Sequence, residues 1–208
     1  MSILSTSCES CQKVMLAYVF WHWPQSHIAL DSYIHHLIDF HQTLAANKPS
    51  GFQESVVFRV RGASWLNTND EAYEEWYLLD DSAAMDRLND AAVSGVCEEP
   101  HNRVAREAAD GIGGLYRLRA GGEELSSAKA ALWLSKPSGV SYKDFYATLQ
   151  PLTSQEGVAL WGRQMTLGPT TEFCIHSTNA IKLPPGYDGL QPQITRIYSS
   201  DNSATSGQ

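Results

Sequence analysis

The sequence predicts an α+β protein in which two units share one order of secondary-structure elements. Short runs of apolar residues end at proline or glycine, as strands do, and longer segments have the apolar spacing of helices. In the first half the expected order is strand, helix, strand, strand, helix, strand, which is the ferredoxin-like (βαββαβ) arrangement. The second half repeats this order without its second helix. We therefore expect ferredoxin-like units at 13–122 and 123–198, between disordered polar tails at 1–12 and 199–208.

The first unit begins with a strand from Lys13 that stops at Pro24. A helix capped by Ser26 follows, because apolar residues recur there at spacings of three and four and form one stripe. The stripe consists of Leu30, Ile34, Leu37, His41 and Leu44. The other expected elements are strands at 55–65 and 73–79 joined by a hairpin loop at 67–70, a helix from 80–82 to about 93, a loop or extra helical turn at 100–109, and a strand at 112–120.

The second unit is expected to contain strands at 130–135, 158–167, 172–177 and 193–198 and a helix at 141–149. Its second helix is missing because 179–191 carries two prolines and two glycines, which favour a loop. The segments 39–44 and 144–149 agree at four of six positions. Together with the repeated order of elements, this similarity indicates a tandem duplication.

Composition and charge narrow the class of protein. The chain has 208 residues, with 15 basic and 23 acidic side chains and a net charge of -8, so we expect no nucleic-acid partner. No apolar run is long enough to span a membrane, and the short run at 14–23 contains His22 and lacks a preceding basic region. Four cysteines are too few for a disulfide scaffold. We therefore expect a cytoplasmic protein with no membrane partner.

Several of these features together resemble the dimeric α/β-barrel superfamily, most of all its EthD-type members. The first strand ends at Trp23-Pro24, and the following helix carries Tyr33, Phe40 and His41. The second half echoes this pattern with Lys136-Pro137, Ser141-Tyr142 and Phe145. Gln42 and Thr43 depart from the EthD pattern, in which a small residue and proline commonly follow the histidine.

The resemblance implies that the two units pack their sheets into one α/β barrel. One chain would then supply both units, so we expect either a monomer or a homodimer. The resemblance also implies a pocket between the sheet and the long helix, where a small, often aromatic or polyketide-like molecule is bound or converted. Several members of the superfamily work without a metal or an organic cofactor.

His41 is the main candidate for a catalytic residue. Its place on the apolar stripe points it toward the sheet, where an imidazole with a pKa near 6.5 is suited to act as a general base. Tyr146 or Tyr33 would donate a hydrogen bond to the substrate. The alternative is a core histidine bonded to a backbone carbonyl or a tyrosine. His22 would reach the mouth of the same pocket as a ligand-binding residue, unless it is an exposed histidine at the end of its strand.

Other candidate ligand-binding residues lie on the expected strands. Four tryptophans would either form flat apolar walls or fill a core: Trp21, Trp76, Trp133 and Trp161. Arg59 and Arg61 share one face of a strand and would bind a carboxylate partner or an anionic ligand. The acidic run at 70–81 is interpreted as a solvated rim.

The sequence predicts no bound metal. Five histidines lie within 22–41, but no two of them are spaced i, i+4 on a helix, and Cys8 and Cys11 lack a second pair of ligands. Haem binding through one helix histidine remains an alternative to a cofactor-free protein.

The favoured function is cofactor-independent proton transfer on an aromatic or polyketide-like substrate, as an isomerase, a cyclase or a lyase, or else cofactor-free oxygenation. The alternatives are a non-catalytic ligand-binding protein and a haem-binding or haem-degrading protein. Whether the chain is an enzyme stays open at this point.

Overall fold

The computed structural model describes residues 15–66, 71–122, 125–166 and 170–201. The expected hairpin loop at 67–70, the N-terminal tail with Cys8 and Cys11, and most of the C-terminal tail lie outside these ranges. No helix in the described ranges is long and apolar enough to cross a lipid bilayer.

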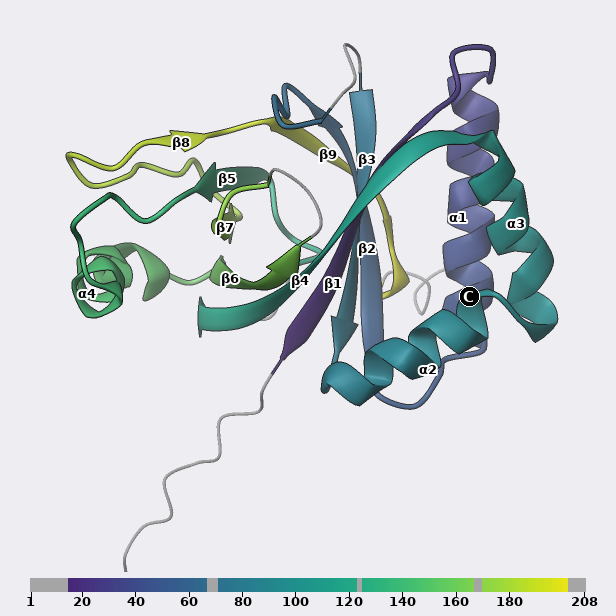
Figure 1. Ribbon diagram of the computed structural model, residues 1–208, viewed down its shortest axis with the longest axis horizontal. Helices are drawn as coiled ribbons and strands as arrows, with labels where there is room; N and C mark the ends of the chain where they lie inside the picture. Colours follow the sequence, from purple (N-terminus) through teal and green to yellow (C-terminus); the bar gives the residue numbers. More distant parts are fainter. Residues whose placement is uncertain (1–14, 67–70, 123–124, 167–169, 202–208) are drawn as a thin grey trace, which may run out of the picture.

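The first half contains four strands and three α-helices (Figure 1). In chain order its elements are β1 (Leu16–Pro24), α1 (Leu30–Ala46), β2 (Phe52–Arg61), β3 (Glu71–Leu79), α2 (Ser82–Ala92), the short 3-10 helix η1 (Gly95–Cys97), α3 (Glu98–Glu107) and β4 (Ala108–Gly121). The second half consists of β5 (Ala130–Leu134), α4 (Tyr142–Thr153), β6 (Val158–Thr166), β7 (Phe173–Ser177), β8 (Gly189–Leu190) and β9 (Gln193–Ser199).

The described strands form one antiparallel sheet with the order β8-β5-β7-β6-β4-β1-β3-β2-β9. It contains two quartets, β4-β1-β3-β2 and β8-β5-β7-β6, and each places its strands in the same relative order. The α+β class and the strand order of the first half are therefore confirmed. Descent of the two quartets from a duplication stays a prediction.

The expectation that the final strand belongs to the second unit is wrong. β9, expected to complete the second unit, pairs with β2 of the first quartet. The place beside β5 is taken by the two-residue β8, which lies in the segment predicted to be a loop. Because the prolines and glycines of that segment leave room for only two paired residues, the following strand is free to extend the other edge of the sheet.

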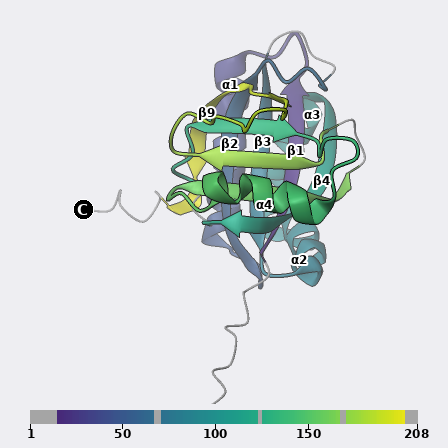
Figure 2. The ribbon, with the colours of Figure 1, turned by 90° about the vertical axis from the view of Figure 1, so that its left-hand side faces the viewer.

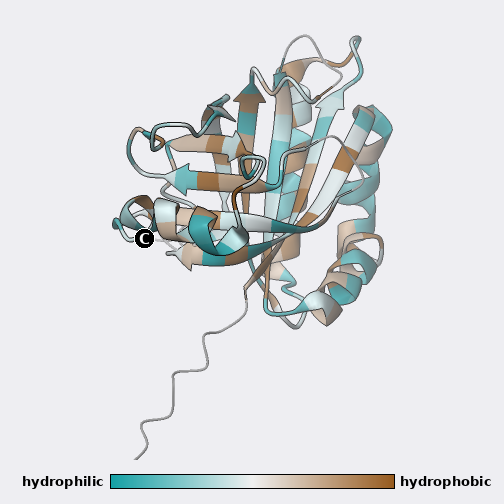
Figure 3. Cartoon of the chain, turned by 60° about the vertical axis from the view of Figure 1, so that its left-hand side comes forward, coloured by the Kyte–Doolittle hydropathy of each residue, from teal (hydrophilic) through white to brown (hydrophobic). Residues whose placement is uncertain are grey.

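The two quartets face each other across a core of tryptophans. Trp76 packs against Trp161 with 5.3 Å between ring centroids, and Trp21 packs against Trp133 at the same separation. All four side chains have 0% exposure, so these rings fill the interior between the quartets. Hydrophobic residues accordingly gather on the strands, whereas the outward surfaces of the helices are mostly hydrophilic (Figure 3).

The helices cover the outer faces of the sheet. α1, α2 and α3 lie over the first quartet, and α4 lies over the second (Figures 1 and 2). Each layer has its own hydrophobic core, one beneath α1–α3 and one beneath α4. The molecule therefore has an interior core and two outer cores, and the site lies within the larger outer layer.

Several helix predictions need correction. The residue before α1 is Ala29 rather than Ser26, and it makes no side-chain capping bond. Leu30 is 44% exposed, because the buried face of α1 is turned toward Tyr33 and Phe40. The segment at 100–109, expected to be a loop or an extra helical turn, belongs mostly to the ten-residue helix α3. Pro100 is its third residue, where the backbone N–H that proline lacks would have no partner within the helix.

Candidate active site

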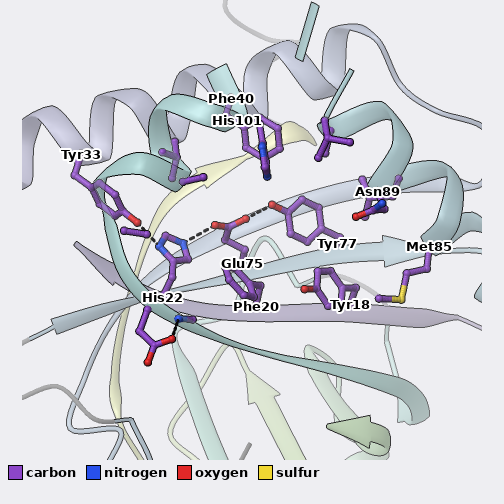
Figure 4. Close-up of a pocket in the computed structure, with 18 of the residues that line it drawn as sticks. Tyr18, Phe20, His22, Tyr33, Phe40, Glu75, Tyr77, Met85, Asn89 and His101 are labelled. Atoms are coloured by element: carbon purple, nitrogen blue, oxygen red, sulfur yellow. Dashed lines mark hydrogen bonds and ion pairs between the residues drawn. The ribbon is translucent and has the colours of Figure 1, made fainter. Parts of the chain in front are cut away.

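A cavity of about 460 Å³ lies between the outer face of the first quartet and helices α1, α2 and α3 (Figure 4). Its floor comes from β1, β3 and β4, and its walls come from the three helices. Most of its lining is aromatic or aliphatic, including Tyr18, Phe20, Phe40 and Tyr77. Such a space suits a small, flat, largely apolar molecule.

Every second side chain of a strand points to the same face of the sheet, and this alternation brings the floor residues together. Tyr18, Phe20 and His22 alternate along β1, and Phe20 pairs with Glu75 of the neighbouring β3. On the other side of β1, His22 pairs with Gly111 of β4. A Cβ atom at Gly111 would lie 2.3 Å from the ring of Phe20, so glycine is needed at this position for the aromatic floor to fit.

Glu75 is the centre of the polar network beneath the cavity. Its Oε1 lies 2.5 Å from Nε2 of His22, and its Oε2 lies 3.2 Å from Nε2 of His41 and accepts a hydrogen bond from Tyr77. Burial alone would raise the pKa of the carboxyl. The neighbouring charges and hydrogen bonds of His22 and His41 outweigh burial and hold the pKa of Glu75 well below its usual range. Glu75 is thus an ionised carboxylate that is itself 4% exposed.

His22 connects Glu75 with Tyr33. Nδ1 of His22 lies 2.5 Å from the Tyr33 hydroxyl, and Nε2 lies at ion-pair distance from Oε1 of Glu75 without the alignment of a hydrogen bond. When His22 is neutral, Nδ1 accepts from the tyrosine and Nε2–H faces the Glu75 carboxylate, which is the tautomer that an ionised carboxylate favours. Burial, and next the charge of Glu75, raise the pKa of Tyr33, which keeps its hydroxyl neutral. The result is a chain of polar contacts, Tyr33–His22–Glu75, that reaches the cavity (Figure 4).

His41 lies behind this chain. It has 0% exposure, which confirms that this side chain points toward the sheet. Nδ1 lies 2.9 Å from Oγ of Ser55, and the hydroxyl of Tyr198 on β9 donates to the His41 carbonyl at 3.1 Å. His41 contacts Glu75 but is not among the residues lining the cavity. We therefore regard it as a positioning residue, and His22 as the histidine on the cavity floor.

The expectation that His22 is an exposed strand-end residue is wrong, because its side chain has 1% exposure. The expected solvated rim is wrong for the glutamates of the acidic run, whereas Asp81 at its end is exposed. Glu71, Glu74 and Glu75 are exposed by 5%, 0% and 4%, since both faces of β3 are covered.

The other candidate residues lie outside the cavity. The four tryptophans lie in the interior core between the two quartets, where Trp21 and Trp76 donate to Glu74 at 2.7 and 2.6 Å. Tyr146, on α4, packs against Phe173 in the second outer core. The structure therefore brings His22, Tyr33 and His41 together around Glu75, and separates them from Tyr146 and from the tryptophans.

The arginine pair does not line the cavity either. Arg61 forms an ion pair with Glu71, with 2.6 Å between Nη2 and Oε2. Arg59 is half-buried and lies near Tyr73, whose pKa is raised mainly by burial and is lowered in part by the charges of both arginines. A ligand-binding role for this pair stays a prediction, at a place separate from the cavity.

No group of three His, Cys, Asp or Glu side chains in the described ranges could hold a metal ion. Haem would need a free imidazole nitrogen for its iron and hydrogen-bond donors for its propionates. Both nitrogens of His22 face Tyr33 and Glu75, so only His101 offers a nitrogen for the iron among the described lining residues. The propionates would find no Lys or Arg in that lining, which instead contains two acids, Glu75 and Asp110. These residues do not fit haem, and no step of the chemistry is assigned to it.

Comparison of the sequence with known protein families and with curated proteins finds no match. The structure is similar to a candidate monooxygenase from Fusobacterium nucleatum, with 11% identity, a TM-score of 0.59, and 90% of this chain and 94% of that chain covered. A candidate monooxygenase from Lactobacillus acidophilus gives 10% identity, a TM-score of 0.55, and coverage of 89% and 95%. An anthrone oxidase-like protein gives 10% identity, a TM-score of 0.52, and coverage of 90% and 92%.

At such low identities the similarity establishes the fold. The chain has the fold of the dimeric α/β-barrel proteins, as the resemblance implied. The specific likeness to EthD-type members is not tested by these comparisons and stays a prediction.

Proposed function

We propose that this protein is an enzyme that removes a proton from a carbon atom of a small aromatic ketone, without a metal or an organic cofactor. The single observation that carries this proposal is the Tyr33–His22–Glu75 chain, which ends at an aromatic-lined cavity. A buried tyrosine backed by a histidine and an ionised carboxylate has the arrangement of a base relay.

In this mechanism the Tyr33 oxygen takes the proton from the substrate carbon while its own proton passes to Nδ1 of His22. The imidazolium that forms is stabilised through Nε2–H by the carboxylate of Glu75, which stays ionised. His41 and Tyr77 hold that carboxylate in place through its other oxygen. The relay therefore places the new positive charge next to an existing negative charge, in a site where water does not screen the attraction.

The carbanion left on the substrate would isomerise or react with dioxygen. Anthrone is a suitable probe, because its methylene carbon is acidic and one of the structural neighbours is an anthrone oxidase-like protein. Oxygenation of anthrone consumes one dioxygen and yields one anthraquinone and one water. The electrons that reduce dioxygen then come from the substrate itself, so no other reductant is required.

The test separates proton removal from oxygenation. Purified protein is mixed with anthrone in deuterated buffer without oxygen, and loss of the methylene proton signals is followed by NMR; oxygen uptake is measured in air. We expect exchange well above the buffer rate. Tyr33→Phe should slow it by about 10² to 10⁴-fold, the usual contribution of a general base. Tyr146→Phe, the matched control on α4, should leave the rate unchanged.

Equal rates for Tyr33→Phe and the wild type would contradict the proposal. Tight binding of anthrone without exchange by the wild type would instead support the non-catalytic binding protein considered from the sequence.

A further inference from the structure

A second histidine faces the cavity from the helical wall, across from the strands that carry His22 and Glu75. His101, on α3, points toward the cavity above Glu75 and Tyr77 (Figure 4). Its ring packs edge-on against Phe40 with 5.5 Å between centroids, and its Nδ1 lies 3.3 Å from Oδ1 of Asn102. These two contacts fix the ring. Nε2 has no hydrogen-bond partner within the described part of the chain and is available to a bound molecule.

The other polar groups of the cavity are less suited to this role. The hydroxyls of Tyr33 and Tyr77 are engaged with His22 and Glu75, respectively. Tyr18 belongs to the strand floor, on the same side as the carboxylate. Asn89, on α2, also lines the helical wall and takes no part in the contacts around Glu75. It is therefore the alternative donor to a bound molecule.

We propose that His101 donates a hydrogen bond from Nε2 to the carbonyl oxygen of the substrate. This inference rests on the proposed function. As the proton leaves for Tyr33, the electron pair of the broken C–H bond forms a carbon–carbon double bond, and the π pair of the carbonyl moves to its oxygen. Negative charge thus develops on an oxygen on the helix side, away from Glu75. A fixed donor at that place stabilises the enolate and selects aromatic ketones over hydrocarbons of the same shape.

Equilibrium binding tests the inference without requiring turnover. Affinities for 2-acetonaphthone and for the isosteric 2-isopropenylnaphthalene, in which =CH2 replaces the carbonyl oxygen, are measured by calorimetry with the wild-type chain. We expect a preference for the ketone of about 3- to 10-fold, as one neutral hydrogen bond provides. His101→Phe should abolish the preference by weakening ketone binding alone, and His101→Gln, which keeps a donor, should retain part of it. His35→Phe, on the exposed side of α1, serves as the matched control.

If His101→Phe fails to fold, His101→Leu replaces it, with circular dichroism as the check on structure. A ketone preference that survives loss of the imidazole would overturn the inference, and so would a preference lost in Asn89→Ala instead. Equal affinity of the wild type for the two probes, or no binding of either, would also overturn it. Failure of the proposed function is distinct, because it would appear as absent proton exchange even when the ketone preference and its dependence on His101 are found.

Discussion

Replacing Glu74 by glutamine should change how the stability of the protein depends on pH. Glu74 lies in the barrel interior with 0% exposure and accepts hydrogen bonds from the indoles of Trp21 and Trp76. Burial raises the pKa of its carboxyl from 4.5 to about 7, even though both indole hydrogen bonds favour the ionised form. The folded protein therefore holds this proton more tightly than the unfolded chain does.

The sign and size of the effect follow from this shift. Below pH 4.5 the carboxyl is protonated in both states, so its contribution to stability is fully present. Between pH 4.5 and about 7 the unfolded chain releases the proton first, and the free energy of unfolding falls. At about 1.4 kcal/mol for each unit of pKa difference, Glu74 removes about 3 kcal/mol of stability across this interval.

A second buried group acts in the opposite direction. Burial lowers the pKa of His176 from 6.5 to about 3, so its contribution to stability rises with pH over an overlapping interval. The curve of the wild type alone therefore conceals the effect of Glu74. The difference between the wild type and Glu74→Gln removes the part of the curve that the two proteins share, and it reports Glu74 together with its contact to His176, whose Nε2 lies 3.9 Å from Oε1 of Glu74.

The assay is urea unfolding at constant ionic strength from pH 4.5 to 8, followed by tryptophan fluorescence. Glutamine offers one acceptor oxygen for two indoles, so the wild type should be more stable by about 1 kcal/mol at low pH. Above pH 7.5 the variant should be more stable by about 2 kcal/mol, because it avoids a buried charge. Glu156→Gln, at an exposed position, is the control. A wild-type-minus-variant difference that stays constant with pH would refute the reasoning.

Three further outcomes are expected. His41→Gln should raise the pKa of Glu75, because one of the partners that stabilise its ionised form is weakened. The acid limb of the pH–rate profile for anthrone exchange should then move to higher pH, and an unmoved limb would argue against a positioning role for His41. Gly111→Ala should push the ring of Phe20 into the cavity and weaken binding of 2-acetonaphthone at least 10-fold, as calorimetry would show, whereas unchanged affinity would place the ligand elsewhere. The purified protein should show no haem absorption band, and an intense Soret band would contradict the cavity's poor fit to haem.

Some of the site could be predicted from the sequence because its signals are local. The spacing of apolar residues around His41 places that side chain toward the sheet whatever the rest of the chain does. Alternation along 56–60 likewise assigns Val56 and Phe58 to one face and Val57 to the other, as the structure shows. Such patterns report which face of an element is buried, and they do not report what lies against it.

Glu75 escaped prediction because its role depends on both layers that cover β3. Adjacent residues on a strand point to opposite faces, so Glu74 enters the barrel interior and Glu75 enters the helix layer. The signal was present in the sequence, since Tyr73, Trp76 and Tyr77 leave neither face of this strand polar. Recognising it requires knowing that a second quartet covers one face and three helices cover the other. This arrangement is set by tertiary structure, as is the pairing of β9 with β2, and neither can be inferred from local sequence patterns.

The central claim is that Tyr33, His22 and Glu75 work as one relay, and a double-mutant cycle on anthrone exchange tests it most directly. Rates are measured for Tyr33→Phe, for His22→Gln and for the variant that carries both changes. Groups that act as a unit give strongly non-additive losses. We predict that each single change slows exchange by about 10² to 10⁴-fold and that the double variant is no slower than the slower single one. Losses that multiply in the double variant would show that the two residues act independently and would contradict the relay.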